Sequence, residues 1–166
     1  MPLFAPTRTL TGAGLRDGDI RAPLVRLAKG MSACSDAPVR VAWKERAAVP
    51  ITEVTATHLY RIAQEAAANA VKHARARSIT IDVSRTSAST RLRIADDGVG
   101  FSAPVSESGL GLRLMKYRAG IIGAELAVTS QLNKGTTVAC SLIHRIPRKP
   151  RRAPGRRTAN PAGGSR

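Results

Sequence analysis

The stretch LYRIAQEAAANAVKHARA, residues 59–76, decides how the rest of this sequence is interpreted. Its hydrophobic and alanine residues recur at helical spacing and predict one broad apolar face. Thr52, just after Pro50, is of a residue type that caps helix N-termini, so we predict a long helix from there to about Ala74. Four polar residues lie one or two turns apart and share a stripe of that helix: Glu65, Asn69, Lys72 and His73.

Shorter elements are predicted on both sides of this helix. Hydrophobic and polar residues alternate, as in half-buried strands, at about 39–43, 79–83, 91–94, 125–129 and 136–143. A Ser/Thr loop at 84–90 is expected to join the second and third strands as a hairpin. Helical spacing predicts two more helices: 15–31, with Asp17 or Asp19 as its cap, and 112–122, ended by Gly123.

The order of these elements predicts an α+β fold, a two-layer α/β sandwich. A helix, a strand, the long helix and two strands precede a glycine-rich loop, a helix and two final strands. This order favours a mixed, mainly antiparallel sheet with the helices packed on one face. We expect three segments: an irregular lead-in at 1–14, the folded domain at 15–146, and a basic disordered tail at 147–166.

The chain is strongly basic, but its charge is unevenly distributed. Its 166 residues suit one domain, and Lys plus Arg outnumber Asp plus Glu by 27 to 11, a net charge of +16. Eight basic residues and no acidic residue lie between Arg145 and Arg166, which is half of the excess. Aromatic residues make up only 3% of the chain, too few for the stacking platforms of single-strand binders. Nucleic-acid binding is therefore the weaker hypothesis, confined to an electrostatic contact of the tail.

Cysteine content and hydrophobicity exclude several other classes of protein. The two cysteines, Cys34 and Cys140, form no CxxC or zinc-ligand pattern, so neither a disulfide framework nor a cysteine metal site is predicted. No hydrophobic run in the sequence approaches the roughly 18 to 20 residues that a membrane helix needs. The N-terminus also lacks a signal-peptide pattern, and we expect a cytoplasmic protein.

Two glycine-containing segments bear on function. The first, Asp96-Asp97-Gly98-Val99-Gly100, follows a predicted strand, and a carboxylate there can accept a hydrogen bond from an exocyclic amine. Alone, this segment is also consistent with a hairpin turn. The second, Gly109-Leu110-Gly111-Leu112, precedes a predicted helix, whose N-terminus and unhindered backbone amides suit a phosphate. Alone, it is also consistent with a simple helix cap.

The polar stripe of the long helix supplies a third signal. The Asn69 carboxamide oxygen is a hard ligand of the kind that Mg²⁺ takes, and the Glu65 carboxylate one turn away is placed to hold a metal-side water. On its own, the stripe is also consistent with the solvated face of an amphipathic helix. The three signals in this order and spacing together predict a Mg-ATP site.

With Gly135-Thr136 added, these motifs resemble the ATP-binding domain shared by gyrase, the heat-shock chaperone, histidine kinases and mismatch-repair ATPases, which has the Bergerat-type fold. Within that superfamily, three segments are similar to the catalytic domain of nitrate-sensor-like two-component sensor histidine kinases: LYRIAQEAAANAVKHARA, DDGVGF and GLGLRLMKYRAGIIGAELAVTS. The resemblance covers roughly residues 15–146.

The resemblance implies catalytic roles for the polar stripe, with ATP and Mg²⁺ as the bound groups. Asn69 would bind Mg²⁺, and Glu65 would orient its water or assist phosphoryl transfer. Lys72 and His73 would face the phosphates.

The resemblance also implies how the nucleotide would be enclosed. Asp96 would accept from the adenine amino group, with Thr136 supporting the pocket beside it. Gly98 and Gly100 would let the chain pass close to the base. The loop 101–111 would close as an ATP lid on its glycine segment, Gly109, Leu110, Gly111 and Leu112.

A histidine kinase also needs a phosphoacceptor histidine on a dimerising helical hairpin, usually followed by an acidic residue. None of the three histidines, His58, His73 and His144, has such a neighbour. The chain is then a truncated gene product, a stand-alone ATPase acting on a histidine of another chain, or a partner-sequestering serine kinase like the anti-sigma proteins. The motifs favour the kinase lineage, with a response regulator downstream. Without the dimerising hairpin, we expect a monomeric chain. Whether it turns over ATP or only binds it is left open.

Deleting residues 147–166 is expected to abolish salt-sensitive binding to DNA and to leave nucleotide affinity unchanged. The reason is that the densest positive charge and the nucleotide motifs lie in different segments of the chain. Fluorescence anisotropy with a labelled duplex at low and high salt, beside ATP titrations of both proteins, checks this. DNA binding that survives the deletion would place the contact on the folded domain instead.

Overall fold

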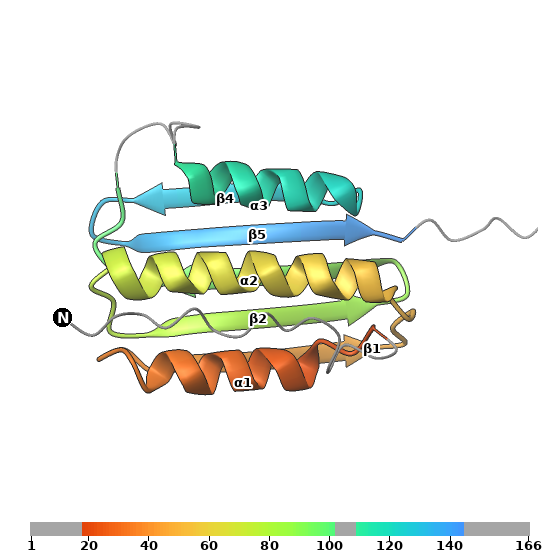
Figure 1. Cartoon of the computed structure of the whole chain (residues 1–166), viewed down its shortest axis with the longest axis horizontal. Helices are drawn as coiled ribbons and strands as arrows, with labels where there is room; N and C mark the ends of the chain where they lie inside the picture. The colour runs from red at the N-terminus through yellow and green to blue at the C-terminus, as the bar shows by residue number, and fades with distance from the viewer. Residues whose placement is uncertain (1–17, 102–108, 145–166) are drawn as a thin grey trace, which may run out of the picture.

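A computed structural model describes residues 18–101 and 109–144 (Figure 1). The predicted lead-in at 1–14 and the predicted tail at 147–166 lie outside the described residues, as do Asp17 and most of the predicted lid. Within the described ranges, the elements follow in the order α1, β1, α2, β2, β3, α3, β4, β5.

The strands form one mixed sheet in the order β1-β2-β3-β5-β4. β1 pairs with β2 in parallel, and the other neighbouring pairs are antiparallel. The bounds are Val39–Arg46 for β1, Ile79–Thr86 for β2, Ser89–Asp96 for β3, Glu125–Gln131 for β4 and Gly135–Ile143 for β5. The parallel pair is possible because α2 carries the chain back across the sheet between β1 and β2.

The helices cover one face of the sheet, and no described helix lies on the other face, called the open face below (Figure 1). They span Arg21–Ser32 (α1), Glu53–His73 (α2) and Leu110–Ile121 (α3). The alternation along β2 separates the two faces: Ile79, Ile81 and Val83 are buried, whereas the residues between them are partly exposed. The predicted α+β sandwich with a mainly antiparallel sheet is confirmed.

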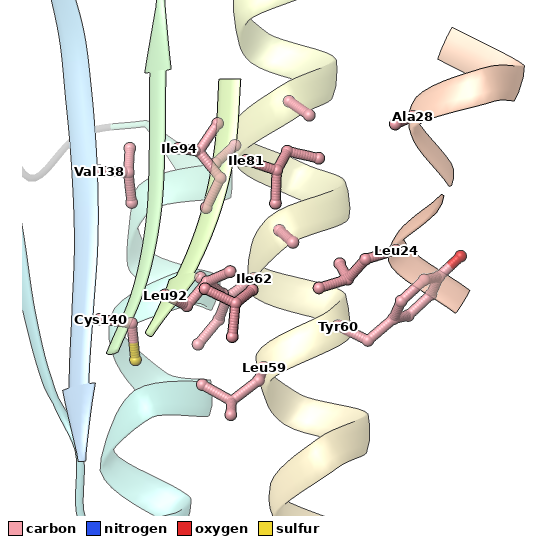
Figure 2. Packing of buried hydrophobic residues seen from close by; sticks show 14 of the residues in the cluster. Leu24, Ala28, Leu59, Tyr60, Ile62, Ile81, Leu92, Ile94, Val138 and Cys140 are labelled. Carbon is pink, nitrogen blue, oxygen red and sulfur yellow. The ribbon is translucent and has the colours of Figure 1, made fainter. Parts of the chain in front are cut away.

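The core is built around α2. Its side chains Leu59 and Ile62 extend toward the sheet, whereas Tyr60 extends toward α1 (Figure 2). Leu59 and Ile62 are fully buried. Burial of an aliphatic side chain of this size contributes about 1.5–3 kcal/mol, so these contacts fix α2 on the sheet. The other buried residues of this helix are mainly alanines: Ala56, Ala63, Ala66, Ala67 and Ala70.

Several element boundaries differ from the predicted ones for local reasons. The strands of the β2–β3 hairpin extend through most of the predicted 84–90 loop, because the Thr86 hydroxyl accepts from the amides of Ala88 and Ser89 and closes a tight turn. Helix α1 begins at Arg21 rather than 15, where the Asp19 carboxylate accepts from the Arg21 amide at 2.8 Å. Helix α3 begins at Leu110 rather than 112.

No helix in residues 18–101 and 109–144 is long and apolar enough to cross a membrane.

Replacing Thr52 by Ala is expected to lower the free energy of unfolding by about 1 kcal/mol. The Thr52 side chain accepts a hydrogen bond from the Thr55 amide at 3.1 Å and so caps α2, as predicted from the sequence. Urea unfolding followed by circular dichroism measures the loss. Thr52→Ser keeps the capping oxygen and serves as the control, and an equal loss in both variants would assign the effect to something other than the cap.

Candidate functional site

A cavity of about 330 Å³ lies between α2, α3 and the strands β3, β4 and β5. Most of its lining is apolar, with a few polar groups, which is the usual composition of a small-molecule site. The lining residues are Ala66, Asn69, Ala70, His73 and Ala74 of the α2 segment, Leu112 and Met115 of α3, Val99, Gly100 and Phe101, and the strand residues Ile94, Asp96, Val128, Thr136 and Val138.

Asp96, the last residue of β3, presents an oriented carboxylate to this cavity. Its Oδ1 accepts hydrogen bonds from the backbone amides of Gly98 at 3.0 Å and Thr136 at 3.2 Å. Two fixed donors on one oxygen hold the carboxylate plane in place. The second oxygen, Oδ2, is then positioned to accept from a donor group of a bound molecule.

The first glycine segment is clamped between α2 and the β4–β5 turn. The Val99 amide donates to the Ala74 carbonyl at 2.8 Å, and the Val99 carbonyl accepts from the Asn133 amide at 2.7 Å. A Cβ at position 98 would collide with the Ala74 carbonyl, and one at position 100, where φ is +55°, would collide with the Gln131 carbonyl. Both glycines are therefore needed for close backbone approach, and this approach is to neighbouring parts of the protein.

The second glycine segment brings α3 onto the polar stripe of α2. A Cβ at Gly111 would collide with the Glu65 carboxylate and lie 3.4 Å from the Asn69 amide nitrogen. Leu112 lines the cavity, whereas Leu110 is 80% exposed. No atom of the described residues lies within 4 Å of a Cβ built at position 109, so these residues explain Gly111 but not Gly109.

The predicted stripe of α2 divides between two places. Asn69 and His73 line the cavity, and Glu65 lies beside them against Gly111. Lys72 instead lines a separate hollow, together with Cys34, Asp36, Arg75 and residues around them. Successive helical residues are rotated by about 100°, so Lys72 points well away from the direction of His73.

Asp97 and Ser130 are site-supporting residues that the sequence interpretation missed. The Asp97 carboxylate accepts from the amides of Arg77 at 2.8 Å and Ser78 at 2.9 Å and so ties the segment after α2 to the end of β3. The pKa of Asp97 is lowered from its ordinary value, mainly by the hydrogen bond from the backbone amide of Ser78. The Ser130 hydroxyl accepts from the Phe101 amide at 2.9 Å. An aspartate pair at a strand end was a signal for Asp97, but nothing in the local sequence distinguishes Ser130.

The three histidines occupy different environments. His73 lines the cavity. His144 contacts the Thr90 hydroxyl through Nε2 at 3.0 Å, which is a structural role at the end of β5. His58 lies partly buried on α2, and burial, followed by the charge of Arg118, lowers the pKa of its imidazole.

Residues 54–146 match the family model described as histidine kinase-, DNA gyrase B- and HSP90-like ATPase. This match covers more than half of the chain. It extends from the α2 helix to the β4–β5 hairpin and so includes the elements that line the cavity. The chain therefore belongs to this family of ATPases.

Sensor histidine kinases are among its relatives, as the motifs predicted. The chain is 33% identical to the sensor histidine kinase LiaS of Bacillus subtilis over 131 residues, covering 78% of this chain and 34% of LiaS. It is 37% identical to the sensor protein VraS of Staphylococcus saprophyticus over 82 residues, covering 49% of this chain and 24% of VraS. The chain thus spans about a third or less of the length of these curated relatives.

A solved histidine kinase domain has the same fold. The histidine kinase domain of the blue-light activated histidine kinase from Erythrobacter litoralis EL346 is similar with a TM-score of 0.63 at 26% sequence identity. The similarity covers 74% of this chain and 60% of that domain. The predicted resemblance to histidine kinase catalytic domains is confirmed.

Asp97→Ala is expected to destabilise the protein at neutral pH, and its difference from the wild type is expected to shrink on acidification. The folded-state pKa of Asp97 lies below the ordinary value of 3.8, so the native state favours the carboxylate. That stabilisation is fully present above the ordinary pKa and is lost as the pH falls through the lowered folded-state pKa. Urea unfolding of both proteins at neutral and strongly acidic pH measures it. A difference that is independent of pH would assign the effect to packing and not to the charge.

Proposed function

We propose that this chain binds Mg-ATP in the cavity and acts as the catalytic domain of a two-component sensor histidine kinase. The observation that carries the proposal is the fixed Asp96 carboxylate at a largely apolar cavity, in a chain that belongs to a family of ATPases. We assign the nucleotide-binding unit to residues 15–146, with 1–14 and 147–166 outside it.

The cavity chemistry suits an adenine base. The exocyclic amine would donate to Asp96, while the aromatic ring would contact apolar walls that include Ile94, Met115 and Val138. A carboxylate only accepts hydrogen bonds, so a base with a carbonyl at the same position would face it with two acceptors. Together with the match to a family of ATPases, this supports adenine as the base.

The residues beside the cavity fit a magnesium ion that is held mainly by phosphate. Among the described residues, no cluster of three or more His, Cys, Asp or Glu side chains is placed to hold a metal. Mg²⁺ usually takes one or two protein ligands and completes its shell with phosphate oxygens and water. Asn69 would be the protein ligand, and the Glu65 carboxylate next to it would orient a water. When bound, the ion would neutralise charge on the phosphates.

The γ-phosphate of ATP would be transferred to a histidine that another chain or segment supplies. His73 would face the phosphates from the cavity wall, and positioning and charge neutralisation would provide most of the catalysis. The names of the sensor kinase relatives support a response regulator as the further partner. The expected product is an acid-labile phosphohistidine, whereas a serine kinase of the anti-sigma type would give an acid-stable phosphoserine.

Asp96→Asn is expected to lower the affinity for Mg-ATP at least about tenfold. It replaces a charged acceptor by an amide, and hydrogen bonds to charged groups contribute about 1.5–3 kcal/mol. Isothermal titration calorimetry with Mg-ATP measures the change, and Asn69→Asp in the same titration tests the magnesium ligand.

Asp82→Asn is the matched control, because Asp82 pairs with Arg93 on the open face of the sheet. Unchanged Mg-ATP affinity in both Asp96→Asn and Asn69→Asp would overturn the proposed site.

A further inference from the structure

Strand β1 lies at one edge of the sheet, beside α1 (Figure 1). It pairs with β2 on one side, and no described strand lies on its other side. An edge strand presents a row of backbone amides and carbonyls with which a further extended chain can pair. With eight residues, β1 is long enough to offer several such groups.

The start of this edge is covered by α1. The Pro38 carbonyl accepts from the Ile79 amide of β2 at 3.1 Å, so the next residue, Val39, points its backbone groups away from β2. The Ser32 hydroxyl of α1 accepts from the Val39 amide at 2.8 Å and donates to the Val39 carbonyl at 3.3 Å. These two hydrogen bonds cover Val39 and end there.

The edge is open beyond Val39. Backbone groups alternate in direction along a strand, so those of Val41 and Trp43 face the same way as those of Val39. The register of β1 with β2 is continuous through both residues, so no bulge changes the alternation. An added strand would therefore find main-chain donors and acceptors at Val41 and Trp43.

A hollow of about 370 Å³ lies next to this edge, between α1 and β1. Its lining residues are mainly aliphatic: Val25, Ala28, Val39 and Val41, with Lys29 and Ser32. Val25 is exposed there despite its hydrophobic side chain. The side chains of an added strand that point toward the helix layer would enter this hollow, where aliphatic groups fit best.

The other side chains of an added strand would meet positive charge. Arg40, Lys44 and Arg46 are exposed on the open face of the sheet, and none of them forms an ion pair with a described residue. Their register partners on β2 are uncharged: Thr80, Ser84 and Thr86. Side chains directly opposite on neighbouring strands lie about 4.5–5.5 Å apart, and opposite charges there attract. Acidic residues therefore suit this side of the added strand.

A second copy of this chain suits the edge less well. If two β1 strands paired in antiparallel, the cations of one copy would face those of the other, and like charges at such positions are destabilising. We propose that the β1 edge binds an extended segment of a partner protein in which aliphatic and acidic residues alternate. The aliphatic side chains enter the hollow beside α1, and the acidic ones lie against Arg40 and Lys44.

This binding surface is separate from the nucleotide cavity. None of the described residues that line that cavity belongs to α1 or β1. The inference therefore goes beyond the proposed function and does not depend on it.

The test titrates the full chain with a peptide as long as β1, eight residues, in which valine and glutamate alternate. Trp43 is the only tryptophan of the chain and is partly buried at this edge, with the guanidinium carbon of Arg21 5.6 Å from its ring centroid. Its fluorescence therefore reports binding at β1 and not at the basic segment 145–166. A saturable change in emission is expected, with an affinity that falls as the salt concentration rises.

Two control peptides separate strand addition from charge alone. One has the same composition without the alternation. The other is methylated on the backbone nitrogens that would pair with β1, so it keeps the side chains and loses the main-chain donors. Neither is expected to bind.

Val41→Pro tests the main-chain pairing from the side of the protein. The Val41 amide faces the free edge, so proline removes a donor for the added strand but no hydrogen bond to β2. The peptide affinity is expected to fall at least about threefold, the effect of one lost hydrogen bond. Val41→Thr keeps the amide and the β-branched shape and is expected to retain binding, and circular dichroism checks that both variants fold.

Lys44→Glu tests the charge of the edge. Replacing attraction by repulsion is expected to weaken binding of the valine–glutamate peptide about threefold to tenfold at low salt, and to strengthen binding of a valine–lysine peptide. Arg91→Glu is the matched control, because it makes the same change of charge on the same face of the sheet, but on β3, two strands away from the edge. It is expected to leave both affinities unchanged.

Each outcome decides the inference. Binding that needs the alternation, is lost on N-methylation and weakens in Lys44→Glu but not in Arg91→Glu supports it. The inference is overturned if the alternating peptide leaves Trp43 emission unchanged, if the N-methylated peptide binds as well, or if both charge variants weaken binding equally. A wild-type dimer that Val41→Pro converts to a monomer in sedimentation velocity would assign the edge to a second copy and also overturn it. These measurements involve no nucleotide, so failure here is distinct from failure of the proposed ATP site.

Discussion

The close approach of α2 to the sheet is the constraint on which the rest of the structure depends. Alanines at positions 66, 70 and 74 recur once per turn and line the cavity on the helix side. Their small side chains let the helix backbone lie near the strands while leaving a hollow that larger residues would fill. The same arrangement brings the Ala74 carbonyl to the Val99 amide, so the helix also fixes the turn that follows Asp96.

Long-range order at the site comes from backbone groups more than from side chains. Asp96 is held by two amides, one from its own turn and one from β5, and the chain at Val99 is held from both sides. Such contacts are rigid because strands and helix ends position the donors. A carboxylate held in this way keeps its direction without needing a charged partner, which suits recognition of a neutral base.

Much of this could be predicted from the sequence, since periodicity reports which face of an element is buried. The long helix, its Thr52 cap and the β2–β3 hairpin follow from local patterns, and the strand-end position of Asp96 follows from the alternation before it. The sequence did not predict that Lys72 would lie apart from Asn69 and His73, because the hollow that Lys72 lines is formed in part by the segment after α1. The supporting role of Ser130 could not be predicted for a related reason. Its partners Phe101 and Thr136 come within hydrogen-bonding distance only in the folded chain, where β4 pairs with β5.

The close contact between Gly111 of α3 and Glu65 of α2 links the packing of the two helices to the geometry of the site. The first turn of α3 rests directly on the Glu65 carboxylate, with no methyl group between them. A side chain at position 111 would need the Glu65 carboxylate to move, because the added Cβ would collide with it. The packing of α3 against α2 and the space available to the Glu65 carboxylate therefore depend on each other.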